Sequence, residues 1–147
     1  MADPSQLILV VEDSDEHFEA VRRAFARTGI RNPLRRYADG DEALDYLFRR
    51  GGHTDDSAWV RPAVVLLDLN LPGTDGREVL DQMKADPGLR SLPVVVVSTS
   101  SSPTDVEQSY RSGASGYIVK PVRFDDFLTA VGSLKSYWFD TVALPGE

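Results

Sequence analysis

The chain has 147 residues, 41% hydrophobic and 27% charged, a composition typical of one globular domain with its own core rather than of a disordered chain. The formal net charge of -7 argues against a protein that binds nucleic acid by neutralising its phosphates. There is no cysteine, which excludes disulfides, and the N-terminus lacks both the basic start and the apolar stretch of a signal peptide. We therefore expect a cytoplasmic, soluble protein that binds neither nucleic acid nor a membrane.

The first apolar segment ends in two acidic residues. Residues Leu7–Val11 are continuously apolar, as in a strand buried on both faces, and Glu12 and Asp13 follow directly. Ser14 or Asp15 is suited to cap the helix predicted next, whose apolar residues recur at helical spacing. The pattern predicts a strand, an acidic loop and a helix.

The same alternation continues to the middle of the chain. Residues Leu34–Ala38 predict a short strand, and Asp39–Asp41 lead into a second helix. Residues Arg50–Pro62 are rich in Gly and polar residues, which predicts a long surface loop. The next strand, Ala63–Leu67, is again continuously apolar and ends on Asp68, after which Pro and Gly turn the chain away. We expect Asp68 to be displayed at the end of a buried strand.

Two further strands end in a hydroxyl and in a cation. After a helix that reaches about Ala85, residues Val94–Val97 predict a strand followed by Ser98. A fourth helix leads to the last predicted strand, Gly116–Val119, which is followed by Lys120. The final amphipathic helix reaches about residue 138, so the core spans about 7–138 and residues 139–147 form a C-terminal extension.

Five strands that alternate with five helices predict an α/β fold: a doubly wound parallel sheet with helices on both faces. Ligands of such sheets bind at the carboxyl ends of the strands. The polar residues predicted at those ends are Glu12, Asp13, Asp68, Ser98 and Lys120.

Several carboxylates at one edge of a sheet repel one another unless a cation lies between them. Ligands that are all oxygen atoms favour Mg²⁺, with Mn²⁺ as an alternative. The candidate ligands are Asp13, Asp68, the backbone carbonyl of Asn70 and, through a water molecule, Glu12.

A carboxylate beside such an ion and a lysine is suited to accept a phosphoryl group, because that transfer depends on positioning and charge neutralisation. Asp68 would be the phosphoacceptor, Lys120 would pair with one phosphoryl oxygen, and the Ser98 hydroxyl would donate to another. Drawing that hydroxyl inward would move the loop that follows it and alter a surface.

The chain resembles the receiver domains of two-component response regulators, the CheY-like family. The resemblance covers roughly Leu7 to Val131 and rests on VVEDS at 10–14, DLNLPGTDG at 68–76, LPVVVVS at 92–98 and GASGYIVKP at 113–121. It implies a flavodoxin-like strand order of 2-1-3-4-5. It also implies phosphorylation of Asp68 by a sensor histidine kinase, a switch formed by Ser98, Tyr117 and Lys120, and a cis peptide bond at Pro121.

The loop at residues 51–61 and the tail WFDTVALP resemble the small response regulators paired with bacterial phytochromes. This resemblance implies a red-light sensor kinase, a bacteriophytochrome, as the phosphoryl donor. Since no output domain follows residue 138, we expect a stand-alone receiver that is not an enzyme beyond its own phosphorylation and slow dephosphorylation. Its output would be binding to a downstream protein that the sequence does not name.

The C-terminal region carries more apolar residues than one face of a sheet needs, which predicts a homodimer. The candidate interface residues are Val106, Tyr110, Tyr137, Phe139, Val142 and Leu144.

Other functions remain open from the residues alone. A phosphohydrolase with an aspartyl nucleophile has a second Asp two residues further on, where this chain has Asn70. A flavodoxin-like flavin protein would need a phosphate-binding loop after the first strand, where this chain has VEDSDE. A third alternative is a docking module that acts without phosphorylation. His17 and His53 are predicted to be a helix-surface residue and a loop residue rather than ligands.

Overall fold

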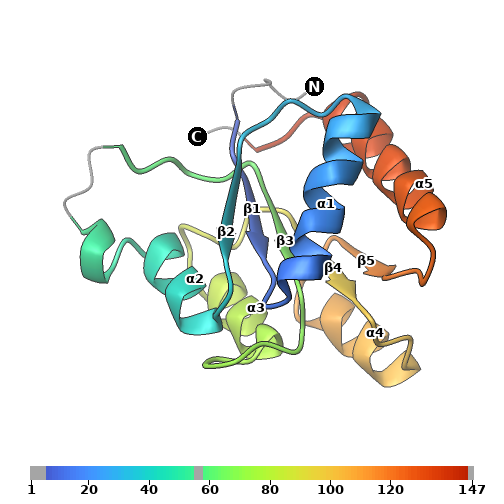
Figure 1. Ribbon diagram of the computed structural model, residues 1–147. Helices are drawn as coiled ribbons and strands as arrows, with labels where there is room; N and C mark the ends of the chain where they lie inside the picture. The colour runs from blue at the N-terminus through green and yellow to red at the C-terminus, as the bar shows by residue number, and fades with distance from the viewer. Residues whose placement is uncertain (1–5, 55–57, 146–147) are drawn as a thin grey trace.

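The computed structural model describes residues 6–54 and 58–145 and shows a parallel sheet between two layers of helices (Figure 1). The strands are β1 (Ile8–Val11), β2 (Leu34–Tyr37), β3 (Val64–Leu67), β4 (Val94–Ser98) and β5 (Gly116–Val119). Their order is β2-β1-β3-β4-β5, and each neighbouring pair is parallel. The predicted fold class and strand order are therefore confirmed.

The helices begin close to the residues that the sequence predicts. They are α1 (Asp15–Thr28), α2 (Gly40–Leu47), α3 (Gly76–Ala85), α4 (Pro103–Arg111) and α5 (Phe124–Leu134), with a short 3-10 helix η1 (Gly51–His53) in the long loop. The side chains of Ser14, Asp39, Asp75 and Ser102 cap the first four of these helices by accepting backbone N–H bonds. Within the described residues, no helix combines the length and the apolar character that spanning a membrane requires.

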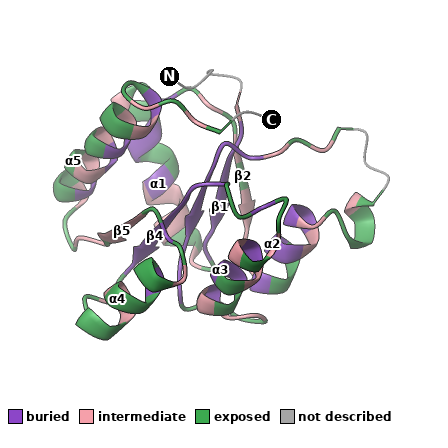
Figure 2. Ribbon diagram, turned by 180° about the vertical axis from the view of Figure 1, so that it is seen from behind, coloured by how far each residue is buried: buried purple, intermediate pink, exposed green. Residues whose placement is uncertain are grey.

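The sheet separates two apolar layers. Along β1, Leu9 and Val11 pack with residues of α2 and α3, whereas Ile8 and Val10 pack with residues of α1 and α5. Figure 1 shows α1 and α5 on one side of the sheet and α2 and α3 on the other. The strands β1, β3 and β4 are buried, and the outer faces of the helices are exposed (Figure 2). This burial on both faces explains why these strands are continuously apolar.

The long loop before β3 is anchored to α2 through Tyr46, which is fully buried. The indole Nε1 of Trp59 donates to the backbone carbonyl of Tyr46 at 2.7 Å, and the Tyr46 hydroxyl donates to the carbonyl of Val60 at 2.6 Å. Apart from η1, the described residues of this segment form a loop, as predicted. The two hydrogen bonds hold the loop against the domain.

The C-terminal segment differs from the prediction. After α5 the chain widens into a π-helical turn, η2 (Lys135–Phe139), in which the N–H of Asp140 donates to the carbonyl of Lys135 at 3.1 Å. The wider turn brings Phe139, which follows Leu134 by five residues, to the same side of the chain. Both side chains are buried in the apolar layer that contains residues of α1 and α5. Leu144 packs against the same layer. Phe139 therefore belongs to the packed core, and its prediction as an exposed interface residue is wrong. Leu144 is half-buried, and its role at an interface stays a prediction.

Candidate functional site

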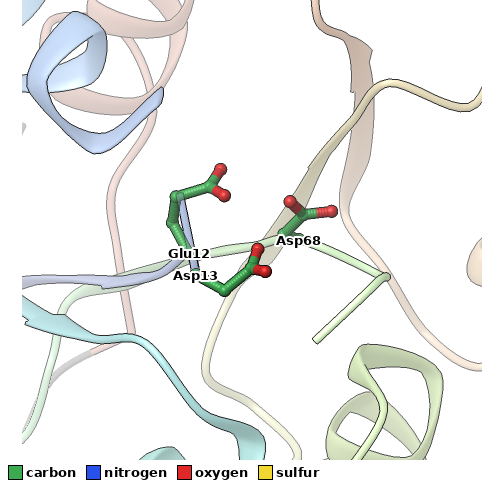
Figure 3. Close-up of side chains that lie close together, drawn as sticks. All are labelled: Glu12, Asp13 and Asp68. Carbon is green, nitrogen blue, oxygen red and sulfur yellow. The ribbon is translucent and has the colours of Figure 1, made fainter. Parts of the chain in front are cut away.

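The three predicted carboxylates meet at the carboxyl ends of β1 and β3 (Figure 3). Val11 pairs with Leu67 in the sheet, and the N–H of Asp68 donates to the carbonyl of Val11 at 3.0 Å. This register brings the following residues together, so that one oxygen each of Glu12, Asp13 and Asp68 lies within 4.8 Å of the others. Glu12 and Asp68 are buried, and Asp13 is exposed.

Lys120 reaches the acidic cluster from the end of β5. Its Nζ donates to Glu12 Oε1 at 2.5 Å and to Asp68 Oδ2 at 2.9 Å. Burial raises the pKa of the Glu12 carboxyl above its ordinary value, and the hydrogen bond and charge of Lys120 oppose that shift. The lysine is therefore placed to neutralise buried negative charge at Asp68.

The structure adds His17, which the sequence analysis placed on the helix surface. Its Nδ1 lies 2.9 Å from Lys120 Nζ. The first turn of α1 follows Asp13 directly and so lies over the strand ends, which is the one signal in the sequence that could have suggested this contact. The site therefore contains the imidazole ring of His17 in addition to its three carboxylates and Lys120.

Two of the predicted switch residues, Ser98 and Tyr117, meet at Ser100. Ser98 is fully buried, and its Oγ accepts the N–H of Ser100 at 3.1 Å. The hydroxyl of Tyr117 donates to the carbonyl of Ser100 at 2.8 Å. Sequence reasoning missed Ser100, which is one of several serines in a row and has no distinctive spacing.

Ser100 is in turn tied to α3 and α4. Its hydroxyl donates to Asp105 Oδ2 at 2.6 Å, and Arg77 NH2 donates to Asp105 Oδ1 at 3.0 Å. The Ser100 hydrogen bond and the Arg77 guanidinium hold the pKa of Asp105 below its ordinary value. The loop after Ser98 is thus held by hydrogen bonds in the conformation observed here.

Asn70 lies at the exposed rim of the site, where its N–H donates to Asp68 Oδ1 at 3.3 Å. The chain then folds back, and the N–H of Gly76 donates to the carbonyl of Leu69 at 2.8 Å. A Cβ on Gly76 would lie only 2.0 Å from the carbonyl oxygen of Asp68. The absence of a side chain at Gly76 is therefore required for the loop to approach Asp68 so closely.

The peptide bond between Lys120 and Pro121 is trans, which corrects the cis bond that the resemblance implied. The N–H of Lys120 donates to the carbonyl of Ser98 at 2.7 Å, so pairing of β4 and β5 continues up to the proline. An X–Pro bond prefers trans by about 0.5–1 kcal/mol, and the motif alone does not impose the cis form. With this trans bond Lys120 already contacts Glu12 and Asp68.

The oxygen atoms of the acidic cluster fit a small divalent cation. Magnesium binds oxygen ligands at about 2.0–2.1 Å, so two ligands of one ion lie up to about 4 Å apart. The ligand atoms of Glu12, Asp13 and Asp68 lie within 4.8 Å of one another, close enough for one small cation to be held by them directly or through water. The donor set contains no sulfur, in keeping with Mg²⁺ or Mn²⁺.

Residues 8–132 match the family model of the response regulator receiver domain. The chain belongs to the response regulator receiver family. Receiver domains are signalling proteins rather than members of a classical enzyme family, and phosphoryl acceptance is the function of the family. They bind Mg²⁺ in an acidic pocket of the kind that this receiver has.

Two relatives match this receiver over nearly its whole length. It is 40% identical over 146 residues to the probable methanogenesis regulatory protein FilR2 of Methanothrix harundinacea, covering 99% of this chain and 91% of FilR2. It is 37% identical over 144 residues to the response regulator Rcp1 of Synechocystis, covering 98% of this chain and 96% of Rcp1.

Solved structures show the same similarity. The phosphorylated cyanobacterial phytochrome response regulator RcpA has a TM-score of 0.88 at 36% identity, covering 96% of this receiver and 99% of RcpA. RPA3017, which acts in red-light signalling of R. palustris, has a TM-score of 0.89 at 37% identity, covering 97% and 99% of the two chains. The Mn²⁺-bound form of Rcp1 has a TM-score of 0.87 at 37% identity, covering 96% and 99%. This receiver is therefore related to phytochrome response regulators.

Proposed function

We propose that this receiver accepts a phosphoryl group on Asp68 in the cytoplasm, from the phosphohistidine of a sensor histidine kinase. The observation that carries the proposal is that the Asp68 carboxylate lies beside two further acids and 2.9 Å from the Nζ of Lys120. The neighbouring acids are suited to binding a cation, and the lysine is suited to binding an oxygen of the phosphoryl group during its transfer.

In the proposed reaction, a carboxylate oxygen of Asp68 attacks phosphorus, and the bond from phosphorus to the imidazole nitrogen of the donor breaks. Mg²⁺ held by Asp13, Asp68 and the Asn70 carbonyl, with Glu12 through water, supplies charge neutralisation when it is bound. Lys120 then exchanges the Asp68 oxygen for a phosphoryl oxygen. The donor imidazole leaves as a neutral ring when its other nitrogen carries a proton, so the step balances without a proton from Asp68.

We further propose that the phosphoryl group changes the loop after β4. The Ser98 hydroxyl turns from Ser100 to donate to a phosphoryl oxygen, and Tyr117 leaves the Ser100 carbonyl. Support comes from the contacts in the structure, since both side chains hold Ser100 by hydrogen bonds. The altered surface would then bind a downstream protein.

A bacteriophytochrome is the proposed donor kinase. Support comes from the similarity to Rcp1 and to the phytochrome response regulator RcpA over nearly the whole chain. Hydrolysis of the acyl phosphate by water is expected to be slow, because Asn70 occupies the position where an aspartyl phosphohydrolase has its general acid.

The direct test is incubation with acetyl phosphate and Mg²⁺, followed by intact-mass measurement. We expect one added phosphoryl group that appears only with the metal and is released by hydroxylamine, which cleaves acyl phosphates. A control without metal should remain unmodified. No mass increase, or a hydroxylamine-resistant adduct, would refute phosphorylation of a carboxylate.

We also propose a homodimer through α4, β5 and the C-terminal segment. The support is the exposure of four large apolar side chains on these elements and on the loop after β5: Tyr110, Val119, Val122 and Tyr137 are 50%, 42%, 104% and 54% exposed. Val106 and Val142 are half-buried. In the proposed interface Val119 and Val122 take the place of Phe139, which packs in the core, and Leu144 remains a candidate.

Combining Tyr110→Ser with Tyr137→Ser should shift the protein from dimer to monomer in sedimentation velocity, because two apolar contacts become polar. Substitution is preferable to removing residues 136–147, since that truncation would also remove Phe139 from the core. Val60→Ser changes an equally exposed apolar residue of the loop before β3 and should leave assembly unchanged. Monomers at every concentration of the wild-type protein would contradict the dimer.

A further inference from the structure

The ammonium group of Lys120 has three hydrogen-bond donors and three acceptors within reach. They are Glu12 Oε1 at 2.5 Å, Asp68 Oδ2 at 2.9 Å and His17 Nδ1 at 2.9 Å. The lysine side chain is only 9% exposed, whereas that of His17 is 44% exposed. The imidazole thus lies at the solvent side of an otherwise buried ammonium group.

The chemistry of the pair fixes the tautomer of His17. An ammonium group donates hydrogen bonds and cannot accept them, so the contact requires a lone pair on Nδ1. The imidazole proton then belongs on Nε2. His17 therefore serves Lys120 as an acceptor through a ring nitrogen, whereas Glu12 and Asp68 accept through carboxylate oxygens.

The position of His17 depends on the cap of α1. The N–H of His17 donates to Ser14 Oγ at 3.1 Å, and the N–H of Ser14 donates to Glu12 Oε2 at 3.1 Å. Since Lys120 donates to both Glu12 and His17, these four residues form a closed ring of hydrogen bonds. The ring connects the ammonium group to the start of α1 independently of Asp68.

We propose that His17 is a positioning residue that holds the ammonium group of Lys120 during phosphoryl transfer; this inference rests on the proposed function. The reaction replaces one partner of Lys120, the Asp68 oxygen, by a phosphoryl oxygen, and a cation in the acidic cluster competes for Glu12. His17 is the acceptor that neither change removes. It keeps the ammonium group directed at the incoming phosphoryl oxygen.

The kinetic test compares His17→Leu with His17→Asn, using acetyl phosphate and Mg²⁺. Loss of one neutral acceptor should slow phosphorylation of His17→Leu by about two- to tenfold, the factor expected for a single hydrogen bond. The Oδ1 atom of asparagine lies near the position of histidine Nδ1, so His17→Asn should recover most of the rate. Adding His17→Leu to Lys120→Ala should cause no further slowing, because the group being positioned is gone.

A spectroscopic test needs no metal and no phosphoryl donor. Nitrogen NMR of the imidazole rings should show His17 as the Nε2–H tautomer, and Lys120→Ala should change that signal while leaving His53 unaffected. An Nδ1–H tautomer, or a His17 signal that ignores Lys120→Ala, would overturn the contact.

The two proposals fail in different ways. A wild-type rate in His17→Leu, equal slowing in the Lys120→Ala background, or no recovery in His17→Asn would overturn positioning by His17 while phosphorylation of the wild-type protein stands. Failure of the wild-type protein to become phosphorylated would overturn the proposed function and, with it, the positioning role.

Discussion

Asp68→Asn is expected to abolish phosphorylation by acetyl phosphate while the protein remains folded. The substitution removes the nucleophilic carboxylate but hardly changes the volume of the side chain. Lys120 keeps Glu12 and His17 as partners, so the buried ammonium group is not left without acceptors. Intact mass gives the extent of labelling, and circular dichroism with chemical denaturation reports the fold.

Asp81→Asn is the matched control, because Asp81 is exposed on α3 and lies away from the strand ends. It should be labelled like the wild-type protein. Hydroxylamine-sensitive labelling that persisted in Asp68→Asn would assign the acyl phosphate to another carboxylate. Loss of cooperative unfolding in Asp68→Asn would show that the residue supports the fold as well as the chemistry.

Gly76→Ala should cause the largest loss of stability among the substitutions considered. Its Cβ would lie 2.0 Å from the Asp68 carbonyl oxygen and 2.7 Å from Leu69 Cα, and backbone atoms cannot rotate away as a flexible side chain can. We expect a loss of about 3 kcal/mol in the free energy of unfolding, at the upper end for overpacking, with displacement of Asp68. Urea denaturation measures the first effect, and the phosphorylation rate measures the second.

Gly132→Ala provides the comparison within the same chain. Gly132 lies in α5, and apart from its chain neighbours and the nearby backbone of its own helix no described atom lies within 4 Å of its would-be Cβ. A methyl group there should stabilise the protein by up to about 1 kcal/mol, because alanine favours helix. Equal stability of the two variants would show that the loop after β3 yields easily and that the close approach of Gly76 is not essential.

The sequence was sufficient for the sheet and for the main acidic site. Residues Leu7–Val11 and Ala63–Leu67 are long apolar runs that end directly in carboxylates, so one pattern gives both the buried strand and the position of the polar residue. The order of the strands came from the resemblance to receivers, because alternation of strands and helices does not determine it. The structure then confirmed the order.

Other features depend on tertiary geometry that no local pattern encodes. The contact of His17 requires the orientation of α1 relative to a lysine more than a hundred residues later in the chain. The burial of Phe139 follows from a π-helical turn that shifts the helical register by one residue, and α-helical periodicity points to Trp138 instead. The isomer at Pro121 was undetermined because the two forms are close in free energy.

If the proposed switch operates, the contacts of Ser100 limit how many conformations it can occupy. Its N–H is bound by Ser98, its carbonyl by Tyr117, and its hydroxyl by Asp105. If only Ser98 or only Tyr117 moved, one bond to Ser100 would be lost while the other still held the loop in place, so half-switched molecules are disfavoured. A partly phosphorylated sample should then contain two discrete populations, visible as two sets of amide NMR signals that exchange slowly. The strength of the signal would then depend on the fraction of molecules that have switched, because each molecule adopts either one conformation or the other.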